Sequence, residues 1–221
     1  MYSPDDEDNR RVFSSFQQIR ASRQPRKITK PSDILHHDVD AGILKLLLYI
    51  YAAPDTPKIE RNTLVVAIDG ACRKNGQTDA TASYGIFFAP DSPLNSNGKV
   101  PAPSSDSVHT NQKAELYALS KTLDIIEEKF GDNFQISRVV VITDSTYLVD
   151  CLTMHIWDWE YNGYKNAKGK PVVNGEVFKE LHKRIEKLEG DGMDVCFWPV
   201  EREWNTEADG LANAALDTVV L

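Results

Sequence analysis

The spacing of apolar and polar positions changes near residue 64. Before that point, residues 33–53 carry apolar side chains at helical spacing, and a stretch with two prolines follows at 52–57. The apolar positions are Ile43, Leu46, Leu47 and Ile50. Apolar residues three and four apart lie on one face of a helix, and proline ends helices. The pattern therefore predicts an N-terminal helix, with a linker, that packs on the domain after it.

After residue 64, short apolar runs bounded by turn residues predict strands. They cover residues 64–71, 83–90, 95–100, 137–145 and 193–200. Asn75 and Gly76 between the first two runs favour a hairpin. The run at 137–145 is apolar without alternation, which is typical of a central strand covered on both faces.

Four further segments predict helices, because their apolar residues recur every three or four positions. They cover residues 110–130, 145–154, 175–190 and 205–217. In 175–190 we expect Val177, Leu181, Ile185 and Leu188 to face inward, and Asn205 is available to cap the last helix. This order of elements predicts an α/β fold, a mixed sheet with helices on its faces.

Composition limits the setting in which the chain works. Its three cysteines are scattered without a CxxC pair, which indicates neither a disulfide framework nor a cysteine zinc site. No apolar run approaches the roughly 18 residues that span a membrane. The acidic start does not resemble a targeting peptide. We therefore expect an intracellular protein, nuclear or cytoplasmic, that is neither secreted nor bound to a membrane.

The chain divides into three parts. Residues 1–32 are polar and predict a flexible tail, residues 33–63 hold the predicted helix and linker, and residues 64–221 form the third part, in which we expect a catalytic domain. The basic run at 20–30 fits a localisation signal or a nucleic-acid-binding arm, and a solvated linker equally well. Residues 64–221 hold 15 Lys and Arg against 24 Asp and Glu, so the acid excess lies in the catalytic part.

Four acidic residues sit where the predicted elements change. Asp69 and Asp144 end strands, whereas Glu115 and Asp209 lie in the first turns of helices. Each alone also fits a turn residue or a charge at a helix N-terminus. Brought together they would repel unless neutralised, and Mg²⁺ with oxygen ligands supplies that neutralisation. Two such ions about 3.5 to 4 Å apart can activate a water and stabilise the leaving oxygen of a phosphodiester.

Five segments carry a resemblance to a known family. IDGACRKNG, TNQKAELYAL, VITDSTYLVD and NTEADGLANAALD are similar to the four signature segments of type 1 ribonuclease H, and WEYNGYKNAKGKPVVN resembles the basic protrusion of that family. The resemblance covers residues 64–218. It implies the ribonuclease H-like fold, a mixed five-stranded sheet of three antiparallel strands followed by two parallel ones, with helices on both faces.

The resemblance also implies an activity. The family cleaves the RNA strand of an RNA/DNA hybrid endonucleolytically, leaving 5′-phosphate and 3′-hydroxyl ends, with two Mg²⁺ ions per site and Mn²⁺ as a possible substitute. Carried over by position, Asp69 would bridge both ions, Asp209 would help hold the water-activating ion, and Glu115 and Asp144 would hold the ion on the leaving-group side. The implied partner is the hybrid duplex, bound by a monomer.

Substrate contacts follow from the same resemblance. The residues that would read ribose 2′-hydroxyls are Cys72, Lys74, Asn75, Asn111 and Gln112. Thr110 and Asn174 match positions that bind a phosphate of the DNA strand, and Trp159 matches one that packs on its sugars. The plain alternatives are a turn, a helix cap and a loop filler. Lys165, with Lys168 and Lys170, forms a basic cluster suited to duplex phosphates, or a solvated run.

The chain departs from the family in the loop before the last helix. VEREWN at 200–205 lacks the His of many members and resembles a His-less branch that keeps the four acids. Glu201, Arg202 and Glu203 are candidates for an auxiliary role, with an exposed charged loop as the alternative. Val108, His155 and Ala167 also differ from the family, which predicts a weaker grip on the DNA strand. The N-terminal region does not resemble the small hybrid-binding module of some members, which predicts less processive action.

Two other functions stay open from the sequence. A related exonuclease would want a second acid where this chain has Ala71. A catalytically weak or inactive module that binds a hybrid or docks a partner would have no reason to keep four repelling carboxylates together.

Overall fold

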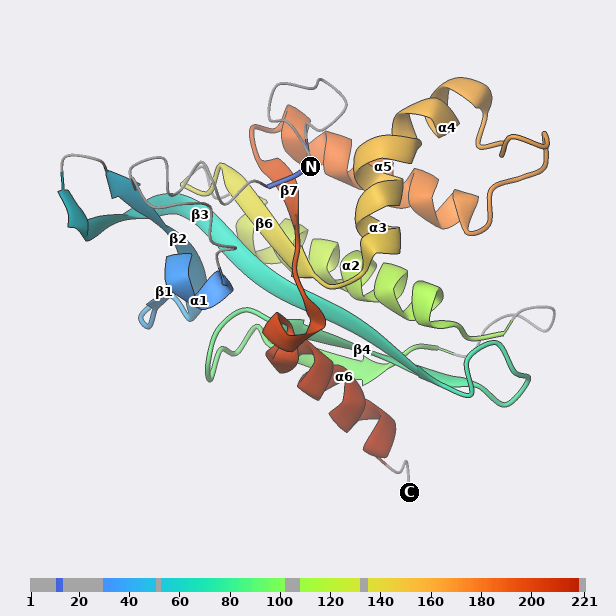
Figure 1. Ribbon diagram of the computed structural model, residues 1–221, viewed down its shortest axis with the longest axis horizontal. Coiled ribbons are helices and arrows are strands. Elements are labelled where there is room, and N and C mark those ends of the chain that lie inside the picture. The colour runs from blue at the N-terminus through green and yellow to red at the C-terminus, as the bar shows by residue number, and fades with distance from the viewer. Residues whose placement is uncertain (1–10, 14–29, 51–52, 102–107, 132–134, 219–221) are drawn as a thin grey trace.

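The computed structural model describes residues 11–13, 30–50, 53–101, 108–131 and 135–218, and its centre is one seven-stranded sheet (Figure 1). The strands are β1 (Leu35–Asp38), β2 (Ile43–Ile50), β3 (Ala53–Arg73), β4 (Thr81–Phe87), β5 (Ser96–Lys99), β6 (Arg138–Thr143) and β7 (Asp194–Pro199). The helices are α1 (Pro31–Ile34), α2 (Asn111–Phe130), α3 (Thr146–Asp150), α4 (Ile156–Asn162), α5 (Gly175–Gly190) and α6 (Thr206–Asp217). A π-helical segment η3 (Cys151–His155) joins α3 to α4, and a short 3₁₀ turn η4 (Arg202–Trp204) precedes α6.

β3 is the axis of the sheet. On one edge it pairs in parallel with β6, which in turn pairs in parallel with β7. On the other edge it pairs with β4 over Ala67–Arg73 and with β2 nearer its start, both antiparallel. β5 lies outside β4, and β1 lies outside β2. The predicted mixed arrangement of three antiparallel and two parallel strands is confirmed as β3 to β7, and β1 and β2 add two strands to the predicted five.

The helix predicted before residue 64 is wrong, because the same residues form β1 and β2. Ile43 and Leu46 are buried, and Leu44 pairs with Val65 of β3. A short apolar run fits a buried strand as well as a helix, so the free edge of β3 decides the outcome. Gly42, with a φ of +63°, makes the turn between the two strands. β3 itself runs across residue 64 without a break.

The predicted flexible tail, residues 1–32, lies mostly outside the described residues. Two parts of it are described, residues 11–13 and 30–32. Val12 forms a parallel bridge to Phe197 of β7, and Phe13 is buried. For residues 11–13 the prediction of a flexible tail is therefore wrong, because backbone pairing and an apolar ring tie them to the sheet.

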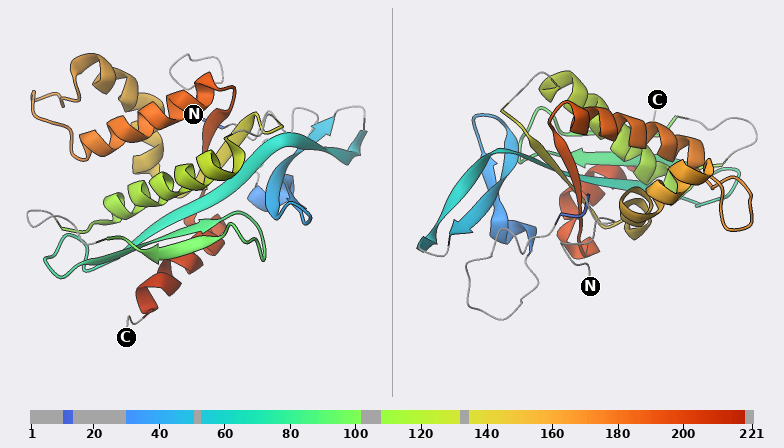
Figure 2. Two further views of the ribbon diagram at one scale, coloured as in Figure 1. Left: turned by 180° about the vertical axis from the view of Figure 1, so that it is seen from behind. Right: turned by 90° about the horizontal axis from the view of Figure 1, so that it is seen from above.

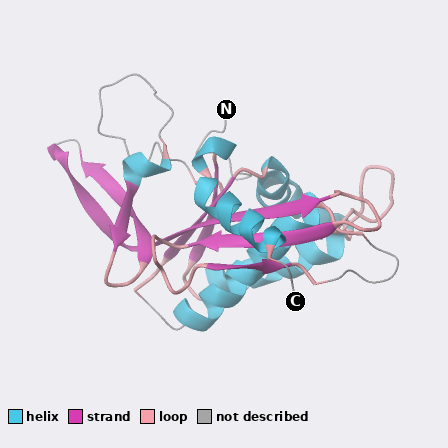
Figure 3. Ribbon diagram, turned by 90° about the horizontal axis from the view of Figure 1, so that it is seen from below, coloured by secondary structure: helices cyan, strands magenta, loops and turns pink. Residues whose placement is uncertain are grey.

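Helices cover the two faces of the sheet, as predicted. α2 and α5 lie side by side on one face and α6 lies on the other (Figures 1 and 2). The larger core lies between the sheet and α2, α3 and α5, and a smaller core on the opposite face includes Ala208 of α6. Figure 3 shows the sheet from below, and the paired ends of β2 and the first part of β3 reach beyond the helices at one side. The inward place predicted for Val177 is wrong, since 41% of it is exposed and Phe178 is buried instead.

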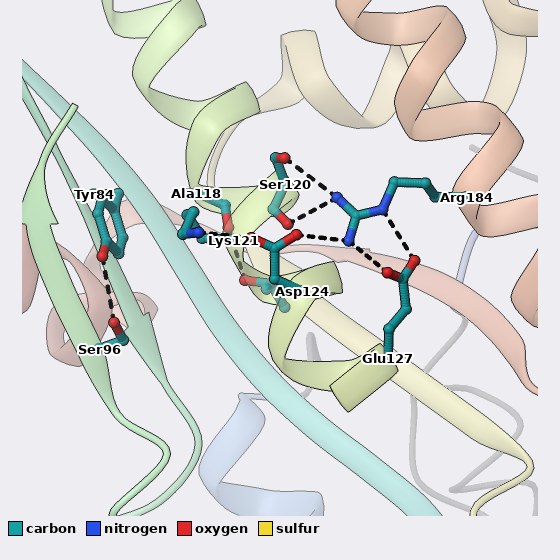
Figure 4. A network of polar contacts seen from close by, with 9 residues as sticks. Tyr84, Ser96, Ala118, Ser120, Lys121, Asp124, Glu127 and Arg184 are labelled. Carbon is teal, nitrogen blue, oxygen red and sulfur yellow. Dashed lines mark hydrogen bonds and ion pairs between the residues drawn. The ribbon is translucent and has the colours of Figure 1, made fainter. Parts of the chain in front are cut away.

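A salt-bridge network fastens α2 to α5 (Figure 4). The Arg184 guanidinium donates from Nε and Nη2 to the two carboxylate oxygens of Glu127, over 3.0 and 2.9 Å. Nη2 also donates to Asp124 over 2.8 Å, and Nη1 donates to the carbonyl of Ser120 over 3.2 Å. Because the Arg184 guanidinium is planar and fully paired, it fixes the spacing of the two helices.

Within the described residues, no helix is both long and apolar enough to span a membrane.

Candidate active site

Asp69 and Asp144 are neighbours because β6 ends beside β3. The last parallel pair is Ala67 with Ile142, so the same register carried two residues further sets Asp69 opposite Asp144. β6 ends at Thr143, whereas β3 continues to Arg73 and keeps pairing with β4 on its other edge. The expectation that Asp69 ends its own strand is therefore wrong. It is the neighbouring strand that ends there, which opens the cleft.

A close approach of α2 brings Glu115 to the same place. A Cβ added to Gly70 would lie 2.2 Å from the backbone nitrogen of Glu115. Only glycine leaves room for the first turn of α2 at this distance. Thr110 caps that turn, because its Oγ1 accepts the N–H of Lys113 over 3.2 Å.

A second close approach brings Asp209 from the opposite face. Gly85 of β4 pairs with Asp69, and a Cβ there would lie 2.2 Å from the carbonyl oxygen of Ala208. α6 therefore rests on the strand next to Asp69, and Asp209 stands in its first turn. Two glycines thus seat the two helices that carry Glu115 and Asp209.

Burial and repulsion mark these acids electrostatically. Burial first, and then the charges of Asp144 and Asp209, raise the pKa of Asp69 to about 6, against the opposing N–H of Gly70. Burial is also the main cause that raises the pKa of Glu115 to about 7, with Asp69 and Asp144 adding to it. Carboxylates whose pKa burial and like charges raise toward neutrality fit a site that a divalent cation would neutralise.

Two neutral side chains hold acids of the site, and the sequence did not point to them. Ser145 donates from Oγ to a carboxylate oxygen of Glu115, and the same Oγ caps α3 by accepting the N–H of Leu148 over 3.2 Å. Asn205, which is 1% exposed, donates from Nδ2 to Asp144 over 3.2 Å and to the carbonyl of Ile68 over 2.9 Å. The prediction that the Asn205 side chain caps α6 is therefore wrong. The only signal in the sequence was their position. Ser145 directly follows Asp144, and Asn205 directly precedes the helix that carries Asp209.

Asp209 is held by a cation and an amide. Arg202 donates from Nη2 to Oδ1 of Asp209 over 2.7 Å, and Asn213 donates to Oδ2 over 2.9 Å. Of the three auxiliary candidates, Arg202 lines the cleft. Glu201 and Glu203 are exposed. All three side chains are exposed, and the sequence could not choose among them, because only the turn η4 decides which one lies at the cleft.

The cleft has the four predicted acids on or near its wall. Its lining includes Asp69, Glu115 and Asp144, together with Arg202 and Asn213, which bind Asp209. The arrangement is open rather than a closed cage. Among the residues that the structure describes, a tighter cluster of possible ligands lies elsewhere. It consists of Glu160, His182 and Glu186, whose ligand atoms all lie within 4.8 Å of one another.

The predicted readers of ribose gather at one end of this cleft. The turn after β3 is tied to the start of α2, because Asn75 accepts the N–H of Asn111 and Gly76 donates to the carbonyl of His109, both over 3.0 Å. Cys72 and Asn111 line the cleft. Lys74 has a φ of +54° and is ion-paired with Asp79, and Gln112 is exposed next to Asn111.

The residues predicted to meet the DNA strand lie in two separate regions. Thr110 stands at the start of α2, whereas Trp159 lies within α4 and Asn174 directly before α5, on the two sides of the loop between these helices. Trp159 packs on Phe178 at 5.4 Å between ring centres, and Asn174 donates to the hydroxyl of Tyr147 over 3.1 Å. Lys165 is exposed on the loop and shares a hollow with Asn174.

Comparison with known proteins gives one consistent result. Residues 61–216 match the family described as RNase H. Ribonuclease H1 of Mus musculus is 32% identical over 162 residues, which cover 72% of this chain and 52% of the mouse protein. Ribonuclease H of Ehrlichia chaffeensis is 32% identical over 162 residues, covering 72% of this chain and 98% of that protein.

A solved structure agrees at the level of the fold. The foamy viral protease-reverse transcriptase in complex with dsDNA superposes with a TM-score of 0.53 at 21% identity, covering 70% of this chain and 94% of that chain. This chain spans about half the length of the mouse relative that it matches. Because the family match covers most of the described sheet and all four acids, the chain belongs to the RNase H family, with type 1 ribonucleases H among its relatives.

Proposed function

We propose that this protein is an endoribonuclease that cleaves the RNA strand of RNA/DNA hybrids by metal-assisted hydrolysis, giving 5′-phosphate and 3′-hydroxyl ends. The observation that carries the proposal is the set of four acids brought to one cleft by β3, α2, β6 and α6. Family membership supports it, since relatives across two thirds of this chain are named ribonuclease H.

The acids suit a metal site. Buried carboxylates that raise one another's pKa need an added positive charge to ionise together, and ribonucleases H generally depend on divalent metal ions. Two Mg²⁺ ions, or Mn²⁺ in their place, would supply the charge that activates a water and stabilises the leaving oxygen. Asp69, Glu115, Asp144 and Asp209 would hold them, with Asp69 shared because it stands at the centre of the four.

The rest of the cleft would select the substrate. The backbone and side chains of Cys72, Asn75 and Asn111 offer polar groups beside the acids, where a ribose 2′-hydroxyl would distinguish RNA from DNA. Trp159, Asn174 and Lys165 would meet the DNA strand at the separate loop. A duplex bound both at the cleft and at this separate loop must span the distance between the two. Its RNA strand would then lie over the acids.

The non-catalytic alternative is weaker on physical grounds. The pKa values of Asp69 and Glu115 are raised mainly by burial and then by charges of the same sign, which is a cost to the fold that a pure docking surface does not need. The exonuclease alternative lacks its second acid at Ala71, which lines the cleft without a charge.

The test is cleavage of an internally labelled RNA/DNA hybrid with Mg²⁺ or Mn²⁺ by wild type and by Asp144→Asn. Asp191→Asn is the matched control, because Asp191 is exposed beyond the end of α5. We expect internal RNA cuts that Asp144→Asn abolishes and Asp191→Asn leaves intact. End-directed degradation would favour the exonuclease, binding without cleavage would favour the docking module, and equal cutting of single-stranded DNA would refute reading of the 2′-hydroxyl.

Two further properties belong to the same proposal. We infer a monomer, because one chain carries all four acids on its own elements. We also infer action inside the cell, where RNA/DNA hybrids arise. Gel filtration with light scattering and imaging of the tagged full chain would test these two inferences.

A further inference from the structure

Arg11 is a buried cation far from the acids of the cleft. It is 2% exposed, and its Nε and Nη2 donate to the two carboxylate oxygens of Glu189, both over 2.8 Å. Its Nη1 donates to Nδ1 of His182 over 2.8 Å, and its guanidinium lies 4.8 Å from the ring centre of Trp157. One side chain from the N-terminal segment thus contacts both α5 and α4.

The backbone around Arg11 is fixed as firmly as its side chain. Phe13 donates its N–H to the carbonyl of Phe197 over 2.8 Å, and Phe197 donates to the carbonyl of Arg11 over 2.7 Å. The Phe13 ring packs on Trp198 at 5.0 Å. Residues 11–13 therefore join the outer edge of β7 through an isolated parallel bridge, with Arg11 directed to the helices.

The histidine that Arg11 contacts on α5 is held by hydrogen bonds and is not available as a metal ligand. A guanidinium only donates, so Nδ1 of His182 must accept and the ring proton must sit on Nε2. Nε2 lies 3.5 Å from a Glu160 oxygen and 3.6 Å from a Glu186 oxygen. A metal ion at this place would need the lone pair of Nε2, which the proton occupies. Glu160, His182 and Glu186 therefore serve to connect α4 with α5.

α4 supports the Lys-rich loop, residues 163–174, which joins α4 to α5 and carries Lys165, Lys168 and Lys170. The helix ends at Asn162, and Gly163 follows with a φ of +73°. Tyr164 then donates its N–H back to the carbonyl of Trp159 over 2.7 Å, which ties the first part of the loop to the helix. A shift of α4 would therefore move the loop that carries Lys165.

We propose that the segment Arg11–Phe13 is a latch that holds α4 against α5 and so sets the position of the Lys-rich loop for the hybrid duplex. The inference deepens the proposed function and rests on it for the identity of the duplex. Arg11 is a positioning residue, because it reaches the loop only through Trp157, His182 and Glu160. Its loss should weaken binding of the duplex and leave the chemistry at the acids unchanged.

The test uses the full chain with Arg11→Gln, Arg11→Lys and the control Arg61→Gln. Arg61 is an exposed arginine on β3, so the control removes the same charge without touching a helix. The first measurement is hydrogen exchange of the amides at 156–172. In Arg11→Gln we expect it to rise about tenfold there and to stay unchanged in β3 and α6, because the latch acts locally.

The second measurement separates KM from kcat on the hybrid. We expect Arg11→Gln to raise KM about threefold or more with kcat within about twofold of wild type, and Arg11→Lys to fall between, because Lys keeps the charge and loses the fork. Arg61→Gln should match wild type in both measurements.

Three results would overturn the latch. They are unchanged exchange at 156–172, a uniform rise over the whole chain, and a local rise with KM unaffected. Absence of cleavage by wild type would instead refute the proposed function and with it the positioning role, while the exchange result would still decide whether the latch exists.

Discussion

Arg202 donates from Nη2 to Oδ1 of Asp209 over 2.7 Å, and it does so inside the cleft that holds the other acids. The ion pair places a protein cation where the acids need positive charge. A metal ion that uses Asp209 therefore competes with Arg202 for the same carboxylate.

We expect Arg202→Met to lower the Mg²⁺ concentration for half-maximal cleavage, by about two- to fivefold. The pair is largely exposed on the arginine side, and such pairs contribute about 0.2 to 1 kcal/mol. A Mg²⁺ titration of the initial rate measures the shift, with Glu201→Gln as the control. A higher Mg²⁺ requirement would show instead that Arg202 assists binding of the metal or the substrate.

The two raised acids predict how stability depends on pH without metal. The pKa of Asp69 is about 6 and that of Glu115 about 7 in the folded protein, above their ordinary values of 3.8 and 4.5. The folded state therefore binds protons more tightly than the unfolded state, so its stability is greatest below about pH 4 and is lost as the pH rises through 6 to 7.

The measurement is urea unfolding in EDTA from pH 5 to pH 8. As far as these two groups decide it, the free energy of unfolding should fall by on the order of 4 kcal/mol over this range. Mg²⁺ at pH 8 should restore it, because a cation neutralises the same charges. Asp144→Asn should flatten the slope. A free energy that rises with pH in EDTA for wild type and Asp144→Asn alike would contradict the raised pKa values.

Gly70→Ala should disable the site by moving α2. The added Cβ would lie 2.2 Å from the Glu115 nitrogen, so the helix must shift, at a cost of about 1 to 3 kcal/mol. We expect cleavage to fall about a hundredfold, because a displacement near 1 Å is enough for such a loss. Gly210→Ala is the control on α6, where, among the described residues, the new Cβ meets nothing within 4 Å apart from the helix's own neighbouring backbone. It should be neutral or slightly stabilising. Equal activity of the two variants would show that α2 tolerates the methyl group.

Arg184→Met should separate stability from activity. It leaves Glu127 and Asp124 facing each other without their shared cation, so we expect the free energy of unfolding to fall by about 1 to 2 kcal/mol. The rate of cleavage at 25 °C should stay close to that of wild type, because the network lies between α2 and α5 and outside the cleft lining. Lys121→Met removes a more exposed partner of Asp124 and should cost less. A larger loss in Lys121→Met would refute the central role of the guanidinium.

The sequence was sufficient for the centre of the fold and insufficient at its margins. Three segments form as expected, because the spacing of their apolar residues fits only one type of element and the same residues are buried in it. They are the strand at 137–145 and the helices at 110–130 and 205–217. The run from Ile43 to Ile50 fits two periodicities, and only the open edge of β3 makes it a strand. The burial of Arg11 could not be predicted, because a polar segment carries no sequence pattern that indicates a buried guanidinium.

The four acids were found from spacing and resemblance, but the means of assembling them were not. Asp69 was expected at a strand end, whereas the register with β6 shows that its neighbour ends instead. The contacts of Ser145 and Asn205 depend on side-chain directions fixed only when α3 and α6 pack. Arg202 was one of three equal candidates until η4 placed it in the cleft.

The premature end of β6 has a consequence for solubility as well as for the site. In the described part of the chain, no strand pairs with β3 beyond Ala67 on that side, and Asn205 meets the next carbonyl, that of Ile68. A bare stretch of central strand invites pairing with a foreign chain and aggregation. Asp69 and Asp144 stand at this edge, and charged side chains at a strand edge disfavour the addition of a foreign strand. Substitutions that neutralise them should be checked for self-association before a loss of cleavage is assigned to chemistry.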